Sequence, residues 1–398
     1  MTIIHISTDY PDSVQSAKTR AIANLVEATA DRFDHQVYSL NRRDIPPASG
    51  MKRWLGKDWG RGIHRHDETG NISSWTYAAP SRGLFLRSSL HAVADILADD
   101  IARRGLRPTL IQGHKLSMEG LIARRLARHF NVPFALSIQG NTDRSILKVR
   151  RDLWPDYGQI FHQAAMVFPF APWALRYCEQ ALGQRNGPVQ MLPCITEQDR
   201  IIAPQEAPDR IMTAFHLRHW QIKNFDRLVK AANRVRQGQS GFTFDIYGGG
   251  EDGLVAMLQR RIDDAKAGGI ALKGSVAGAD MQAVMNRHAG FCMVSRRESY
   301  GMVFAEALLA GCPIVYPADA AVDGYYDGQS FALAVAPQDD GAIAEAMRKI
   351  LRDQKAMKQD LAAWQQSGAA REFQRDTIRG NYARGLGIAL GEEKADAG

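Results

Sequence analysis

Two carboxylates, Glu298 and Glu306, lie in the segment 298–313, which follows a β-rich apolar run. The segment predicts a loop that enters a helix, because Gly311 and Pro313 are residue types that end one. The first N–H groups of a helix have no partner within it, so such a start can hold a phosphate oxygen. The carboxylates that bracket it can accept hydrogen bonds from the hydroxyls of a ribose or a sugar ring. Taken alone, the pair is explained equally well by a helix cap and a charge on a solvated face.

Two cations, Arg218 and Lys223, follow a predicted strand at 211–215 and precede an amphipathic helical pattern. Their side chains can converge where that strand ends. Two cations that face the start of a helix would neutralise the charge that grows on a departing diphosphate. Each residue alone is explained more simply as an exposed surface charge.

Short β-rich runs alternate with helical patterns along the chain, which predicts two Rossmann-like, doubly wound α/β domains. Polar residues and two prolines at 196–209 indicate a linker between a domain of residues 1–195 and one of residues 210–367. A helix at 368–390 is expected to cross back to the first domain. Ligands of open parallel sheets bind beyond the carboxyl ends of the strands, so we expect a site in a central cleft between the two sheets. The expected strands are 3–7, 36–40, 109–112, 134–138, 166–169, 211–215, 242–247, 270–273, 291–294, 313–316 and 331–335.

The composition is typical of a folded enzyme with more than one core, since 398 residues exceed what one core usually holds. The N-terminus enters a strand directly, and no apolar run is long enough to cross a bilayer, so we expect a cytoplasmic protein. The four cysteines lack C-x-x-C spacing and predict buried free thiols. No residue cluster has the spacing of a zinc site, and no Asp-x-Asp pair follows a strand, so we expect no metal.

The two segments together resemble the retaining, two-domain glycosyltransferases of family 4, which have the GT-B fold. The resemblance covers most of residues 210–390 and rests on the Glu-x7-Glu pair and the Arg-x4-Lys-Asn run, in the expected order. It implies transfer of a hexose-type sugar from a UDP- or GDP-sugar to a hydroxyl of a glycan or lipid-linked acceptor, without a further cofactor. It also implies retention of configuration by a front-face route, and a place in bacterial polysaccharide or glycolipid synthesis.

The resemblance implies roles for individual residues. Arg218 and Lys223 would hold the diphosphate, Glu298 the donor sugar and Glu306 the ribose, so Arg218, Lys223 and Glu298 are the expected catalytic residues. Leu217 departs from the glycine usual in the family and would tighten the backbone near the phosphates. The other expected donor-binding residues surround the helix start or belong to a glycine-rich turn: Ser299, Tyr300, Gly301, Met302, Val303, Gly250 and Glu251.

The glycine-rich turn 248–253 satisfies the G-x-G-x-x-G pattern of dinucleotide sites. It follows the second strand of its domain, whereas that pattern belongs after the first strand. We therefore interpret it as a turn that borders the nucleotide.

In the N-terminal half, polar residues follow two predicted strands and are expected to orient the acceptor or the donor sugar: His114, Gln139, Asn141 and Asp143. Gln139 stands where the family often has a histidine. An amide can also hydrogen-bond a hydroxyl, so either Gln139 or His114 is the expected substitute. The loop 8–18 should border the phosphates or the acceptor.

The net charge of +7 comes with two basic sets in the first half of the chain. One extends over residues 42–65 with Trp54 and Trp59, and the other is Arg124, Arg125 and Arg128 on one predicted helix. An anionic membrane surface, such as the inner face of the plasma membrane, would suit both sets, although solvated surfaces explain them more simply. No nucleic-acid motif accompanies the charge, so nucleic acid is not an expected partner.

Two other functions stay open. A nucleotide-sugar epimerase of the same fold would use the same donor site and would turn over without an acceptor. A non-catalytic donor-binding protein would bind the donor and transfer nothing.

Overall fold

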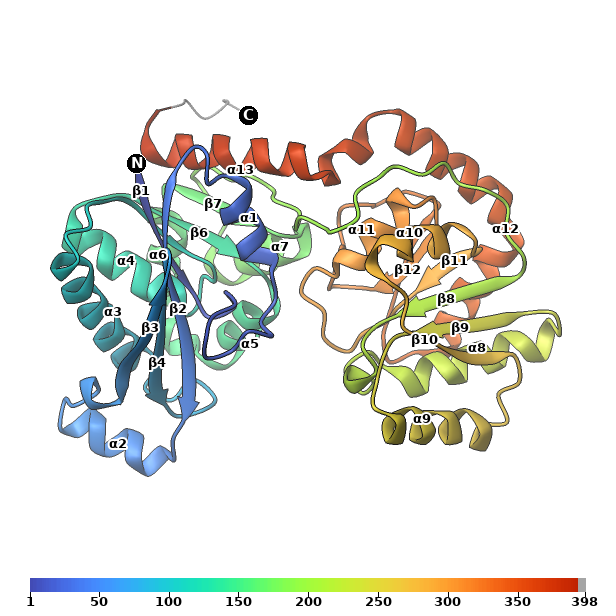
Figure 1. The fold of residues 1–398 in the computed structure, drawn as a ribbon, viewed down its shortest axis with the longest axis horizontal. Coiled ribbons are helices and arrows are strands. Elements are labelled where there is room, and N and C mark those ends of the chain that lie inside the picture. The colour runs from blue at the N-terminus through green and yellow to red at the C-terminus, as the bar shows by residue number, and fades with distance from the viewer. Residues whose placement is uncertain (393–398) are drawn as a thin grey trace. The chain divides into compact units, whose positions relative to one another are not determined.

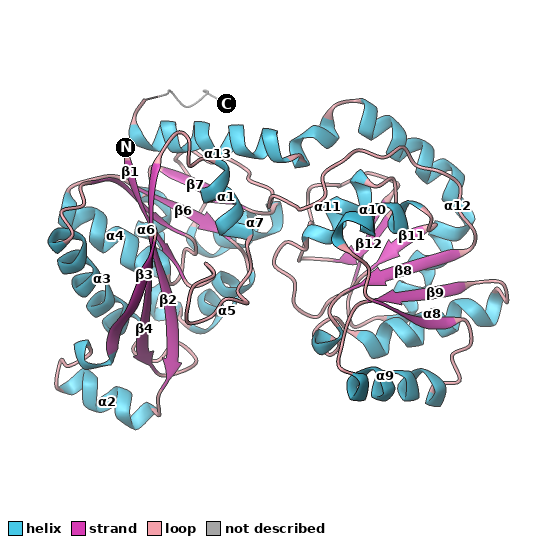
Figure 2. Cartoon of the chain, viewed as in Figure 1, coloured by secondary structure: helices cyan, strands magenta, loops and turns pink. Residues whose placement is uncertain are grey.

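The computed structural model describes residues 1–392, which divide into two compact units (Figure 1). The first unit contains Met1–Pro193 and residues 378–392, and the second contains Cys194–Thr377. Each unit is one sheet with helices on its faces (Figure 2). The segment 196–209, which we expected to be a linker, is grouped with the second unit, where the Ile202 N–H donates to the Leu309 carbonyl at 2.8 Å.

The sheet of the first unit has the order β3-β4-β2-β1-β5-β6-β7, and all neighbours are parallel except β3 and β4. The central strand β1 lies between β2 and β5, and its apolar residues are buried because helices cover both faces. The strands are β1 (Thr2–Ser7), β2 (Asp34–Asp44), β3 (Ile63–Thr69), β4 (Ile72–Ala79), β5 (Pro108–Gly113), β6 (Phe134–Ile138) and β7 (Met166–Pro169).

The β3–β4 hairpin was not predicted from the sequence. Its first strand is an edge strand rich in charged residues, which hides the alternation expected of a strand. Gly70 and Asn71 between the two strands were the available signal, since such a pair favours a two-residue hairpin turn.

Helices of the first unit pack on this sheet (Figure 1). The first of them, α1, buries Ile22, Leu25 and Val26 and ends at Ala28. The last helix, α13, packs through Gly385 against the Phe168 ring, and its Tyr382 hydroxyl donates to Gln112 Oε1 at 2.7 Å. The helices are α1 (Ala21–Ala28), α2 (Pro47–Leu55), α3 (Leu86–Arg103), α4 (Glu119–Phe130), α5 (Asn141–Val149), α6 (Trp154–Gln163), α7 (Pro172–Leu182) and α13 (Arg375–Leu390).

The second unit is an all-parallel sheet of order β10-β9-β8-β11-β12-β13. The chain winds outward in one direction from β8 and in the other from β11, so the topological switch point lies between these two strands. The strands are β8 (Arg210–Ala214), β9 (Thr243–Tyr247), β10 (Ile270–Gly274), β11 (Gly290–Cys292), β12 (Ile314–Pro317) and β13 (Ala332–Val335). The helices are α8 (Phe225–Gly238), α9 (Asp252–Asp264), α10 (Gly278–Asn286), α11 (Met302–Leu309) and α12 (Asp340–Gln366).

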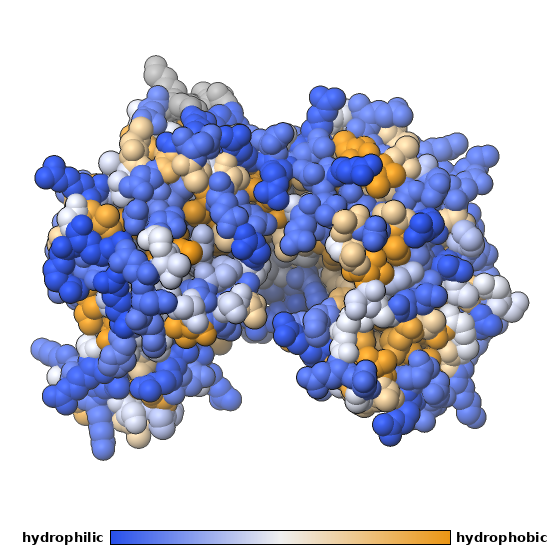
Figure 3. Space-filling view, in the orientation of Figure 1, coloured by the Kyte–Doolittle hydropathy of each residue, from blue (hydrophilic) through white to orange (hydrophobic). Residues whose placement is uncertain are grey.

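Polar residues cover much of the face of each unit in Figure 3, with hydrophobic residues in separate patches. Among residues 1–392, no helix has the length and apolar character needed to cross a membrane. All four cysteines are buried and unpaired, as predicted.

Candidate active site

The two sequence motifs meet at the switch point of the second unit. Lys223 follows β8 and Glu298 follows β11, and Lys223 Nζ lies 2.5 Å from Glu298 Oε2. The Ser295 hydroxyl donates to the same carboxylate oxygen at 3.3 Å. Both charged side chains are only partly buried, with exposed fractions of 21% and 14%. The pair is therefore preformed and open to a ligand.

Asn224 connects the two loops that carry this ion pair. Its backbone is left-handed, with φ of 62°, a conformation that asparagine tolerates better than most residues. The side-chain amide donates to the carbonyls of Val294 at 3.0 Å and Pro337 at 2.7 Å. Arg296 Nε donates to the side-chain oxygen Oδ1 of Asn224 at 3.1 Å. These bonds fix Lys223, the preceding residue, relative to the loop after β11.

Arg218 lies on a 3-10 turn, Leu217–His219, and is exposed. Its Nε donates to His219 Nε2 at 3.1 Å, and no carboxylate among residues 1–392 pairs with its guanidinium group. The structure therefore does not join Arg218 to the Lys223–Glu298 pair, and the cation is available to an anion.

Leu217, the departure from the family glycine, is buried. Its N–H donates to the Gly249 carbonyl at 2.9 Å, and its side chain occupies the space beside Gly250. The glycine-rich turn thus makes room for the larger residue at 217. This contact places the glycine-rich turn beside the loop that carries Arg218. That the turn borders the nucleotide stays a prediction.

The helix α11 begins at Met302, where the sequence predicted it, after Gly301 with φ of 74°. Ser299 is half-buried and Tyr300 is buried, and both precede the helix start. Met302 and Val303 supply N–H groups of the first turn, which have no acceptor within the helix. The start of α11 therefore presents donors near Glu298.

Glu306 lines a cavity of about 320 Å³ that lies within the second unit. Burial raises the pKa of the Glu306 carboxyl to about 7, and the nearby Glu197 carboxylate adds to the rise. Loops after β8, β9 and β10 complete the cavity wall, with Phe215, His216, Gly248, Gly249, Ser275 and Val276. Gly250 and Glu251 come directly after these glycines and do not line the cavity, so the expected donor contacts of these two residues stay predictions.

His114 lies in the core of the first unit and does not present a free ring nitrogen. Its Nε2 is 3.0 Å from His5 Nδ1, and its Nδ1 is 3.2 Å from the Ser137 hydroxyl. His5 in turn contacts His35 at 2.8 Å. In this arrangement His114 has no nitrogen left for a sugar hydroxyl.

The other N-terminal candidates surround the start of α5. Gln139 is 9% exposed, and its amide nitrogen has no hydrogen-bond partner among residues 1–392. Asn141 is buried in the first turn of α5. The Ser117 N–H and hydroxyl donate to Asp143 at 2.8 and 2.7 Å, and burial raises the pKa of this carboxyl to about 6.

A charged cluster at the carboxyl ends of β1 and β5 was not predicted as a cluster from the sequence. Lys115 Nζ lies 2.6 Å from Asp9 Oδ2 and 2.6 Å from the Thr8 hydroxyl. Glu119 Oε1 accepts from the Thr8 N–H at 2.9 Å and from its hydroxyl at 2.7 Å. The available signal was that Lys115 and Thr8 both follow predicted strands.

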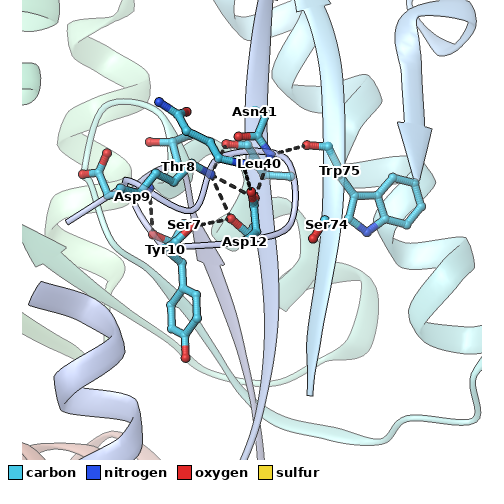
Figure 4. A network of polar contacts seen from close by, with 12 residues as sticks. Ser7, Thr8, Asp9, Tyr10, Asp12, Leu40, Asn41, Ser74 and Trp75 are labelled. Atoms are coloured by element: carbon cyan, nitrogen blue, oxygen red, sulfur yellow. Dashed lines mark hydrogen bonds and ion pairs between the residues drawn. The ribbon is translucent and has the colours of Figure 1, made fainter. Parts of the chain in front are cut away.

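The loop after β1 lacks glycines and is held instead by Asp12 (Figure 4). This carboxylate accepts from Asn41 Nδ2 at 2.7 Å, from Lys18 Nζ at 3.0 Å and from the Gln15 N–H at 2.7 Å. The Asp12–Lys18 pair is almost fully buried. The loop that carries Thr8 and Asp9 is therefore rigidly tied to β2.

The three core histidines are expected to make stability depend on pH. Burial lowers the pKa of His35 to about 4 and that of His114 to about 3, below the value near 6.5 in an unfolded chain. The unfolded chain therefore binds more protons in this range, so stability is present above about pH 6.5 and is lost as pH falls. The raised pKa of Asp143 has the opposite effect on stability, because the folded protein then binds the extra proton. The contribution of a histidine is therefore measured by comparing the wild type with a variant that lacks it.

We expect wild-type protein to lose about 1–2 kcal/mol more stability between pH 7 and pH 5 than His35→Asn. Urea unfolding at the two pH values measures the difference. Equal losses in the two proteins would show that His35 does not titrate with folding.

Residues 208–353 match the family model described as glycosyl transferases group 1. The second unit is therefore similar to the glycosyl transferases of group 1 over these residues. The family expected from the Glu298–Glu306 and Arg218–Lys223 motifs is thereby confirmed for this part of the chain. A comparison with curated proteins found no match.

Solved structures similar over nearly the whole chain belong to several enzymes. Sucrose-phosphate synthase from Thermosynechococcus elongatus is 17% identical, with 98% of this chain and 99% of that chain covered and a TM-score of 0.66. An α,α-trehalose-phosphate synthase (UDP-forming) from Burkholderia xenovorans, in complex with glucose-6-phosphate, is 13% identical, with 97% and 99% covered and a TM-score of 0.63. Anabaena HepE, in complex with UDP and glucose, is 14% identical, with 96% and 98% covered and a TM-score of 0.61. These likenesses establish the GT-B fold, and the predicted fold class is confirmed.

Proposed function

We propose that this GT-B protein is a retaining glycosyltransferase that moves a hexose-type sugar from a nucleotide diphosphate sugar to a hydroxyl acceptor. One observation carries the proposal. The Lys223–Glu298 pair lies at the switch point of a group 1 domain, beside the start of α11, the helix that also carries Glu306 into a cavity.

The proposed donor position follows from this arrangement. The nucleoside enters the cavity, whose volume of about 320 Å³ suits part of a nucleotide, and its ribose hydroxyls donate to Glu306. The diphosphate then meets Lys223, Arg218 and the free N–H groups of α11. Lys223 then turns in part toward the diphosphate, and Glu298 accepts hydrogen bonds from hydroxyls of the donor sugar.

The proposed reaction relies on leaving-group stabilisation. The bond between the anomeric carbon and the diphosphate oxygen breaks, and the acceptor oxygen forms its bond on the same face. The acceptor proton passes to an oxygen of the leaving diphosphate, so no protein nucleophile takes part. Lys223 and Arg218 neutralise the charge that grows on the diphosphate, which is the largest contribution expected here.

A UDP-sugar is the donor we propose, because the Anabaena HepE structure holds UDP and glucose and the Burkholderia enzyme is described as UDP-forming. The Burkholderia structure holds glucose-6-phosphate, which supports a soluble sugar or a glycan hydroxyl as acceptor.

Within the first unit, Gln139 is the residue we propose for contact with a sugar hydroxyl, because its buried amide nitrogen lacks a partner among residues 1–392. A role for Asn141 and Asp143 beside it is part of the same proposal.

A cytoplasmic location with peripheral contact to the inner face of the plasma membrane is also proposed, in bacterial polysaccharide or glycolipid synthesis. The support is helix α2, where Trp54 is 48% exposed and Leu55 69% exposed next to Lys52 and Arg53. Exposed aromatic and aliphatic side chains among cations suit an anionic lipid interface.

The test of the proposed function is calorimetric titration of the purified protein with UDP, GDP, ADP and dTDP, followed by transfer assays with the matching sugars. Selective binding of one nucleotide, lost in Lys223→Ala, together with a product that keeps the anomeric configuration, is the expected result. If no nucleotide binds, the transferase proposal fails. Turnover of the donor without an acceptor would instead support the epimerase.

The affinity for UDP is expected to rise with pH through the pKa of Glu306. Between pH 6 and pH 8 a carboxyl with a pKa of about 7 changes from mostly protonated to mostly ionised, and the ionised form accepts better from ribose hydroxyls. We expect about a tenfold gain in association constant over this range. Calorimetry on Glu306→Gln is the control, because UDP itself titrates. An equal gain in that variant would exclude Glu306 as the cause.

A further inference from the structure

A second cavity, of about 640 Å³, opens among helices α3, α4 and α6 of the first unit. None of its lining residues belongs to the proposed donor site. Four arginines line it against two aspartates, and Leu121 and Ile160 give it apolar contacts. We call it the arginine pocket, and its charged lining residues are Arg87, Arg124, Arg125, Arg128, Asp95 and Asp156.

Two of the four arginines are neutralised by carboxylates. Arg125 makes a two-pronged contact with Asp95, at 2.5 and 2.9 Å. Arg87 Nη1 lies 3.0 Å from Asp156 Oδ2. These two pairs use both aspartates of the pocket.

The other two arginines, Arg124 and Arg128, keep their charge. Arg124 donates to the neutral amide oxygens of Gln159 at 2.5 Å and Gln163 at 3.0 Å. Arg128 has no hydrogen-bond or ion-pair partner among residues 1–392. Two uncompensated cations thus line one side of the cavity.

The spacing of these two cations is unfavourable for the helix. Residues four apart on a helix are neighbours on its surface, so like charges there repel. Burial and the charge of Arg128 together lower the pKa of Arg124. The glutamines orient Arg124 without neutralising it, which preserves its charge for a ligand.

We propose that the arginine pocket binds a phosphate-bearing ligand, a phosphomonoester or a diphosphate, through Arg124 and Arg128. Planar guanidinium groups match the oxygens of a phosphate in two-pronged geometry, and a bound dianion would remove their mutual repulsion. The volume exceeds the need of a phosphate group alone, so the ligand has an organic part that contacts Leu121 and Ile160. A soluble phosphorylated compound and a lipid headgroup share this chemistry. The proposal is independent of the proposed donor site.

The test uses sodium pyrophosphate and vesicles as probes, at constant ionic strength. Because pyrophosphate would also enter the donor site, calorimetry is done on Lys223→Gln as well as on the wild type. The pocket variant is Arg124→Gln with Arg128→Gln. The matched control, Arg32→Gln with Arg107→Gln, removes the same charge from exposed residues of the same unit that pair with no carboxylate of the described residues 1–392. Circular dichroism and thermal unfolding check that each variant folds.

Pyrophosphate binding that survives Lys223→Gln, weakens at least tenfold in the pocket variant and is kept in the control would support a soluble phosphorylated ligand. The same variant pattern in flotation with phosphatidylcholine vesicles containing phosphatidic acid, a lipid whose headgroup is a phosphomonoester, but without pyrophosphate binding, would support a lipid headgroup. Equal behaviour of the pocket and control variants with both probes would overturn the proposal.

Discussion

Replacing Lys223 with alanine is expected to lower kcat/KM for sugar transfer by about two to three orders of magnitude, the usual cost of removing one stabilising donor from a transition state. The change removes the cation that pairs with Glu298 at 2.5 Å. Because Lys223 is partly exposed, stability should change little. Steady-state kinetics with the donor that binds, together with urea unfolding, measures both quantities.

Lys230→Ala is the matched control for this variant. Lys230 lies on α8 and is exposed, and it shares Asp340 with Arg227 and Arg234, so the same charge is removed from the same unit away from Glu298. Its kcat/KM should stay within about threefold of wild type, as for most surface substitutions. Activity of Lys223→Ala within threefold of Lys230→Ala would show that Lys223 does not hold the diphosphate.

Replacing Gly248 with alanine is expected to damage both the fold and nucleotide binding. Its φ of 149° is rarely adopted by other residues, and a Cβ atom there would lie 1.8 Å from the Phe215 carbonyl oxygen. Phe215 and Gly248 both line the Glu306 cavity, so a shift of either loop changes its shape. We expect a loss of about 2–4 kcal/mol in stability from strain and overpacking combined. UDP binding should weaken at least tenfold.

Gly253→Ala offers a control five residues further along the chain. Gly253 lies in helix α9, with no atom near the position of an added Cβ. Alanine favours a helix over glycine, so this variant should be as stable as wild type or more stable by up to about 1 kcal/mol. Thermal unfolding and calorimetry distinguish the two variants. Equal stability and affinity in both would mean that the close approach of the β8 and β9 loops has no consequence.

The sequence predicted the repeating architecture well, because buried parallel strands and amphipathic helices leave a clear period in the order of residues. The helix after Glu298 begins where the pattern placed it, since Gly301 and Gly311 mark its two ends with left-handed backbone conformations. The β3–β4 hairpin was missed because its edge strand, Ile63–Thr69, is mostly polar and exposed, so it forms through hydrogen bonds to β4 and leaves no apolar pattern in the sequence. Local propensity cannot show a pairing partner.

The sequence by itself determined which residue types could meet at the donor site and in which order they follow the strands. Only the tertiary structure decided that Lys223 contacts Glu298 across 75 positions and that Glu306 lines a cavity. It also decided that no carboxylate of residues 1–392 pairs with Arg218. The same holds for His114, both of whose ring nitrogens are within hydrogen-bond distance of core residues, His5 and Ser137. The physical reason is that ion pairs, burial and pKa values depend on distant groups brought close by the fold. Periodicity and propensity record only neighbours along the chain.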